Sequence, residues 1–227
     1  MKIKKFNCSP KITTRVEIPT REQVREVCAD LERTVVNQVY SVDDLIDDVG
    51  HFVARKFRVN VLHAKALEVE ASEVNINAFY DAERDERKKI SIELVFVTNP
   101  NDDYLILDED LWTLLVNRLA DSLAHELIHM RQARDRDFLS VDHRSKRNIA
   151  IDENLVYLSD PDEIDAYAYN IATELREHAN PIQKLQNPKA VTIVDSVNLW
   201  AYINAFAQNI SNPVVKKLLK KIYKLLT

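Results

Sequence analysis

The sequence predicts an α+β fold that is predominantly helical, with a small, mostly antiparallel sheet placed before a long helix near the middle of the chain. Glycine occurs once in 227 residues, where average usage would give roughly sixteen, so folds that depend on many tight glycine turns are disfavoured. Two β-rich runs, 74–80 and 90–97, lie close together in the sequence. Helical apolar spacing surrounds them on both sides.

The first hundred residues are expected to begin with an extended arm or strand over 1–19. Thr20 to Gln23 spells T-R-E-Q, a capping box that opens a helix reaching about Val39. A second helix is predicted from Ser41 to Phe57. Gly50, the single glycine, lies on the apolar stripe of this helix. Glycine inside a helix costs about 1 kcal/mol relative to alanine, so Gly50 indicates a close-packing point rather than a turn.

The β unit is expected to be a pair of antiparallel strands. Residues 74–80 alternate apolar and polar side chains, and 90–97 is strongly β-forming, with the charged connection DAERDERKK between them. Four helices should follow. The first should begin at Asp108 or Asp110 and run beyond Arg131, and the second should begin at Ser159 or Asp160 and end near Asn180. The third should cover about Ser196 to Gln208, and the fourth Pro213 to Leu226. We interpret 1–227 as one domain, in which 1–107 holds the first helices and the β unit and 108–227 is helical.

Composition excludes several classes of function. With one glycine, the chain cannot contain a dinucleotide-binding G-x-G-x-x-G turn, a P-loop or a G-x-S-x-G nucleophile elbow. A net charge of −5 gives no reason to expect nucleic-acid binding. Cys8 and Cys28 are too few for a disulfide framework or a thiolate metal site. The N-terminus has no apolar signal region, and no run approaches the ~18 apolar residues of a membrane span, so we expect a cytoplasmic protein.

The strongest chemical signal is His125-Glu126-Leu127-Ile128-His129, which is H-E-x-x-H inside the predicted helix from Asp108. Residues four apart on a helix lie about 40° apart and one turn along, so both imidazoles can bind one metal ion. Glu126 projects beside the ion, where a general base can take a proton from water. Alternatively the motif is a solvated helix face with ordinary hydrogen bonds. The metal interpretation is favoured, because apolar residues on the other side of the helix would bury it and fix the ligands.

A third protein ligand is needed for a catalytic zinc site. The residues after His129 are MRQARD, which excludes the metzincin continuation H-x-x-G-x-x-H. Glu163, in the run PDEIDAYAYN, is the favoured third ligand, and the small Ala166 would let its helix approach closely. Glu163 could instead be a capping-box glutamate at the third helical position. The competing ligands are His143, Asp142, Asp165 and Glu153. His143 is expected to be exposed in a polar loop, with donation to a transition-state oxyanion as the alternative.

At these two motifs, HELIHMRQ and PDEIDAYAYNIA, the chain resembles the gluzincin branch of zinc metallopeptidases. It is similar in particular to the small ImmA/IrrE-like zincins and to uncharacterised peptidase-like proteins of tailed phages. The resemblance implies a zincin-like fold, a Zn²⁺ cofactor held by His125, His129 and Glu163, and Glu126 as general base. It also implies that Ile90–Val97 lies near the edge strand of the cleft, where a protein or peptide substrate adds in extended form. A phage-encoded source is a further implication.

One position departs from the thermolysin-like pattern. Those enzymes carry an aspartate four residues after the ligand glutamate, which orients a ligand histidine; here that place is Tyr167. Asp165 could supply the missing carboxylate, or none is present.

The expected activity is hydrolysis of peptide bonds by a metal-activated water, without a covalent intermediate. The alternative is a zincin-derived binding or structural protein with little or no turnover. The C-terminal helix adds a separate question, because it carries five lysines without an acid. It could lie on an anionic surface, although we expect its apolar face to pack on its own domain. The five residues are Lys216, Lys217, Lys220, Lys221 and Lys224.

Overall fold

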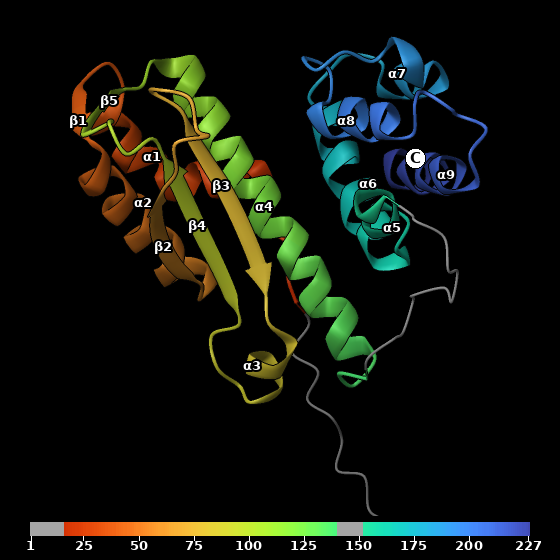
Figure 1. Ribbon diagram of the computed structural model, residues 1–227, viewed down its shortest axis with the longest axis horizontal. Helices are drawn as coiled ribbons and strands as arrows, with labels where there is room; N and C mark the ends of the chain where they lie inside the picture. Colours follow the sequence, from red (N-terminus) through yellow and green to blue (C-terminus); the bar gives the residue numbers. More distant parts are fainter. Residues whose placement is uncertain (1–15, 140–151) are drawn as a thin grey trace, which may run out of the picture.

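A computed structural model describes residues 16–139 and 152–227 and confirms the α+β class (Figure 1). Two lobes are visible, and each has its own apolar core. The first lobe contains the sheets and α4 (Glu109–Asp135), and the second is entirely helical and contains α6 (Pro161–Arg176). The boundary between the cores therefore falls after α4, because this helix packs against the sheet. Cys8, Asp142 and His143 lie outside the described residues.

The N-terminal segments largely follow the expected pattern. Residues 16–20 form neither helix nor strand. The capping box at Thr20 is confirmed, since its hydroxyl accepts from Gln23 N at 3.2 Å and Gln23 Oε1 accepts from Thr20 N at 2.8 Å. The first helix stops four residues earlier than expected, because a short strand pair follows it. The elements here are α1 (Arg21–Val35), β1 (Val39–Ser41), α2 (Val42–Phe57) and β5 (Tyr104–Ile106), with β1 antiparallel to β5.

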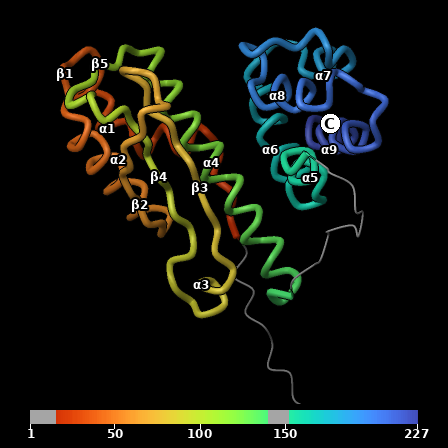
Figure 2. Tube along the Cα trace, viewed as in Figure 1, coloured from red at the N-terminus to blue at the C-terminus, as the bar shows by residue number. Residues whose placement is uncertain are grey.

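The main sheet has three strands in the order β2-β4-β3 (Figure 2). The predicted antiparallel pair is confirmed as β3 (Val74–Tyr80) and β4 (Ile92–Thr98), and the charged connection carries the short helix α3 (Ala82–Glu86). The sequence did not predict β2 (Asn60–Lys65), which pairs parallel with β4. β4 is the central strand, as its strongly apolar run favours, and it adjoins β3, one of the two edge strands. The run Ile90–Val97 therefore lies beside an edge strand and does not itself form the edge.

Gly50 lies where α2 crosses β2. A Cβ atom at this position would be 3.0 Å from Cγ1 of Val61 on β2. The single glycine is therefore a close-packing point inside a helix, as the sequence predicts.

The helical lobe packs α6 against α9 and α8 around a second core. Val215, Leu218 and Ile222 on α9 are fully buried, and Lys221 forms an ion pair with Asp165 on α6. The basic C-terminal helix thus packs its apolar face on its own lobe, and its other four lysines are exposed. The sequence missed two of the short helices. The elements of this lobe besides α6 are α5 (Glu153–Leu158), α7 (Pro181–Gln186), the 3₁₀ turn η1 (Pro188–Ala190), α8 (Val197–Ala205) and α9 (Pro213–Leu226).

In the described part of the chain, no helix combines the length and the apolar character that crossing a membrane requires.

The contact at Gly50 predicts that Gly50→Leu destabilises the fold. The larger side chain cannot fit against Val61, and overpacking of this kind costs about 1–3 kcal/mol. Denaturant unfolding followed by circular dichroism would measure the change. In Gly50→Ala, the gain in helix propensity offsets part of the crowding, so a smaller loss is expected. A Gly50→Leu protein with the wild-type free energy of unfolding would show that the α2–β2 contact is looser than described.

Candidate metal centre

The two histidines are positioned by the burial of α4. The helix begins at Asp108, whose carboxylate accepts a hydrogen bond from Leu111 N at 2.8 Å. Leu119 and Leu123 are fully buried in the first core, which fixes the rotation of the helix. As a result His125 is buried and His129 is half-buried, and both face α6.

Glu163 comes from the first turn of α6 and points at both imidazoles. Its Oε2 lies 3.1 Å from Nε2 of His125, and its Oε1 lies 3.2 Å from Nε2 of His129. The helix start is capped by Asp160, which accepts from Asp162 N at 2.8 Å. Thus the Glu163 carboxylate is directed to the histidines. One ligand atom from each of the three residues lies within 4.8 Å of the others.

A small residue permits this approach of α6 to α4. Ala166 is fully buried, one turn beyond Glu163. Tyr167 packs edge-on against His125, with ring centroids 5.1 Å apart. It therefore occupies the side of His125 with an aromatic ring rather than a carboxylate.

Gln132 orients the second histidine, and sequence reasoning missed it. Its Oε1 lies 2.9 Å from Nδ1 of His129, and its Nε2 donates to the Asp162 carbonyl at 3.1 Å. Because the amide nitrogen is committed to a carbonyl, Oε1 must accept a proton from Nδ1. With Nδ1 protonated, Nε2 of His129 is the atom that can lose its proton and offer a lone pair to a metal ion held between His129 and Glu163. The only signal in the sequence is the spacing of three residues from His129.

Of the two alternatives for the orienting carboxylate, the one that assigns it to Asp165 is excluded. Asp165 pairs with Lys221 on α9, away from the histidines. Its position two residues after Glu163 explains this, since two helical steps turn it by about 200°. Glu153, another competing ligand, lies exposed at the start of α5 and is not part of the group of three.

The pKa values of the two glutamates near the histidines, Glu126 and Glu163, are shifted in opposite directions. Burial works against ionisation of Glu163, but the hydrogen bonds from His125 and His129 outweigh it and lower its pKa to about 2. Burial raises the pKa of Glu126, which accepts a hydrogen bond from the Tyr80 backbone. Glu163 is therefore the permanent anion that suits a metal ligand, and Glu126 is the better proton acceptor.

Tyr157 is a second residue that sequence reasoning missed. Burial, followed by its hydrogen bond with Glu163, raises the pKa of this tyrosine. Its hydroxyl therefore stays protonated and donates to the Glu163 carboxylate. No feature of the sequence distinguished it.

A cleft of about 530 Å³ opens beside His125 and Glu126. The consecutive residues Asn75–Phe79 of β3 form one wall. Side chains of consecutive residues point to opposite faces of a strand, so the cleft meets the free edge of β3 rather than one face. The floor is α4, and Tyr157, Tyr167 and the start of α8 form the other side.

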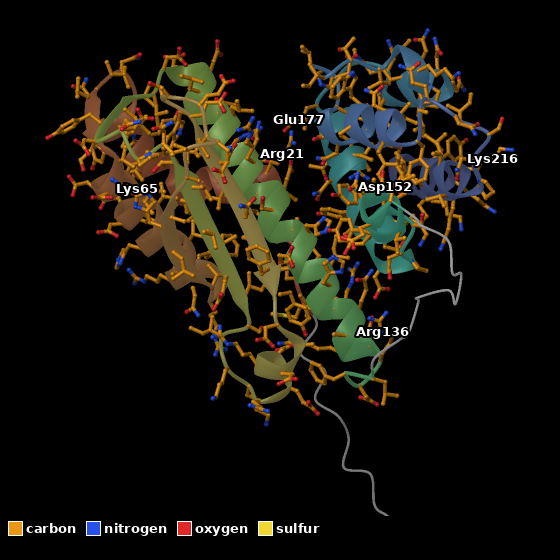
Figure 3. The ribbon with its side chains drawn as sticks, in the orientation of Figure 1. Arg21, Lys65, Arg136, Asp152, Glu177 and Lys216 are labelled. Atoms are coloured by element: carbon orange, nitrogen blue, oxygen red, sulfur yellow. The ribbon has the colours of Figure 1, made fainter. Side chains whose placement is uncertain are left out.

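A partly buried ion cluster links the two lobes, and Figure 3 labels two of its members, Arg21 and Glu177. Arg21 on α1 donates two hydrogen bonds to Asp121, at 2.9 and 2.6 Å, and another to Glu177 at 2.6 Å. Asp121 precedes His125 by one helical turn, and Glu177 follows the last turn of α6. Burial raises the pKa of the neighbouring Glu174 to about 7. The cluster fixes α6 against α4 at the end opposite the Glu163 contact.

The role of Gln132 predicts that Gln132→Leu weakens zinc binding. Loss of a partner that orients a ligand typically costs roughly 10–100-fold in metal affinity. Competition with a fluorescent chelator would measure this. Gln132→Glu keeps an acceptor for Nδ1 and should restore much of the affinity. An unchanged affinity in Gln132→Leu would mean that Gln132 does not orient His129 for metal binding.

The raised pKa of Glu126 predicts a pH-dependent stability difference in the metal-free protein. Above that pKa the buried carboxylate is ionised at a cost to the folded state, and below the ordinary glutamate pKa of 4.5 the cost is absent. Glu126→Gln should therefore be more stable than wild type near neutral pH and equal to it below pH 4.5. Thermal unfolding at both pH values tests this, with the exposed Glu86→Gln as control. A constant difference across the range would contradict the assignment.

No protein-family model, curated protein or solved structure matches the chain.

Proposed function

We propose that the protein is a zinc-dependent metallopeptidase of the gluzincin type, which hydrolyses peptide bonds with Glu126 as general base. One observation carries the proposal. The Nε2 atoms of His125 and His129 and the carboxylate of Glu163 converge beside Glu126, at a cleft that borders a free strand edge.

The donor set supports zinc as the metal. Two imidazole nitrogens and one carboxylate are the protein ligands of a well-known class of catalytic zinc sites that keep an open position. Bound there, zinc would supply a Lewis acid that polarises a carbonyl and makes water more acidic. Gln132 and Tyr157 would hold His129 and Glu163 in their binding orientations.

The remaining chemistry belongs to the chain's own residues. The free edge of β3 would bind an extended peptide through backbone hydrogen bonds and bring its carbonyl to the site. Glu126 would take the proton of the attacking water and pass it to the leaving amine. Burial suits Glu126 for this, because a carboxylate with a raised pKa is a stronger base.

Glu126→Gln separates the peptidase from the alternative, a zincin-fold binding or structural protein. The variant should keep about one zinc per chain, because Glu126 is not a ligand, and should lose peptide cleavage by at least 10²-fold, the size of a general-base contribution. Metal analysis by mass spectrometry and cleavage of a peptide library are the two measurements. Glu109→Gln, at the exposed start of the same helix, is the matched control.

The outcomes are distinct. Zinc-loaded wild type that cleaves no peptide, with zinc retained in both forms, would favour the binding protein. Purified protein that binds no zinc at all would overturn the metal site itself.

A further inference from the structure

Arg118 lies on the floor of the cleft, on the same face of α4 as Glu126. Arg118, Ser122 and Glu126 all line the cleft and are spaced four residues apart, which places them along one side of the helix. With a rise of 1.5 Å per residue, eight residues put Arg118 about 12 Å from Glu126 along the helix axis.

The positive charge of Arg118 is not neutralised by a carboxylate within the described part of the protein. Its side chain is exposed, and its contact is a long one, 3.5 Å to Oδ1 of Asn75 on β3. It forms no ion pair with any carboxylate in residues 16–139 and 152–227. By contrast, Arg21, Arg134 and Arg136 are each paired with a carboxylate. Among the described residues that line the cleft, Arg118 is the sole arginine or lysine.

The direction of β3 determines which end of a bound peptide would reach Arg118. The Tyr80 backbone contacts Glu126, and Asn75 contacts Arg118. The strand therefore runs from Arg118 towards Glu126. A peptide that adds antiparallel to β3, the more stable pairing per residue, runs the other way. Its C-terminal side then extends from Glu126 to Arg118.

We propose that Arg118 selects substrates that carry a carboxylate three or four residues to the C-terminal side of the cleaved bond. The spacing follows from the rise of about 3.3 Å per residue in an extended peptide, over about 12 Å. The carboxylate belongs either to an acidic side chain or to the C-terminus of the substrate, since a guanidinium binds both in the same way. This inference rests on the proposed peptidase function.

Peptide series with the zinc-loaded protein test the proposal. One series places Asp, Asn or Lys at each of the first five positions after the cleaved bond, and the other compares free and amidated C-termini at each length. Wild type should prefer the carboxylate at the third or fourth position by roughly tenfold in kcat/KM, a difference of about 1.4 kcal/mol. Most of the effect should appear in KM, and it should shrink at high salt. The first series shows whether Arg118 binds an acidic side chain of the substrate, and the second shows whether it binds the C-terminal carboxylate of the substrate.

Variants of Arg118 assign the preference to this residue. Arg118→Ala should remove it, and Arg118→Glu should turn it into a preference for Lys. Arg131→Ala is the matched control, since Arg131 is exposed on the same helix but does not line the cleft. Circular dichroism and thermal unfolding verify that each variant is folded.

A binding measurement separates this inference from the peptidase proposal. Fluorescence anisotropy of the same peptides on Glu126→Gln protein needs no turnover. A preference that persists in Arg118→Ala, or equal binding of acid and amide forms at every position, would overturn the role of Arg118. A wild-type protein that binds carboxylate peptides but cleaves none would instead overturn the peptidase.

Discussion

The contact of the Glu163 carboxylate with two imidazoles of α4 is the central one of several polar contacts that join lobes with separate apolar cores. Each of the two described apolar cores draws its residues from one lobe. The face between α4 and α6 is instead polar at both ends, with His125, His129 and Glu163 at one end and the Arg21 cluster at the other. Removing one member of a buried ion cluster typically costs 3–5 kcal/mol, because the remaining charges stay buried. The placement of Glu163 against the two histidines therefore depends on charge pairing as well as on the burial of Ala166.

This arrangement explains how the site and the cleft are linked. α4 carries the histidines, Glu126 and Arg118 on the sides that face α6 and β3, while its apolar side is buried in the first core. The hairpin of β3 and β4 is tied to the end of the same helix, since Asp85 in α3 accepts two hydrogen bonds from Arg134, at 2.7 and 2.6 Å. One helix thus sets the positions of His125, His129 and Glu126 and is tied to the strand edge that borders the cleft.

The sequence predicted the structural features that are determined by residues close together in the chain. The capping box at Thr20, the antiparallel pairing of the runs 74–80 and 90–97, and the helix caps at Asp108 and Asp160 follow from side chains close in sequence. The trio of His125, His129 and Glu163 also came from spacing, helped by a family resemblance. The sequence missed β2 because its parallel pairing with β4 joins segments about thirty residues apart, and no turn signal marks such a crossover. Gln132, Tyr157 and Arg118 gain their roles from contacts with other elements, which a single sequence does not reveal.

We propose that His125, His129 and Glu163 hold one zinc ion beside Glu126. Anomalous X-ray scattering at the zinc edge, from crystals of the zinc-loaded protein, tests it most directly. One strong peak is expected about 2.0–2.2 Å from Nε2 of each histidine and from an oxygen of Glu163. A peak that lacks the Glu163 oxygen, a peak elsewhere in the molecule, or no peak at full zinc loading would contradict it.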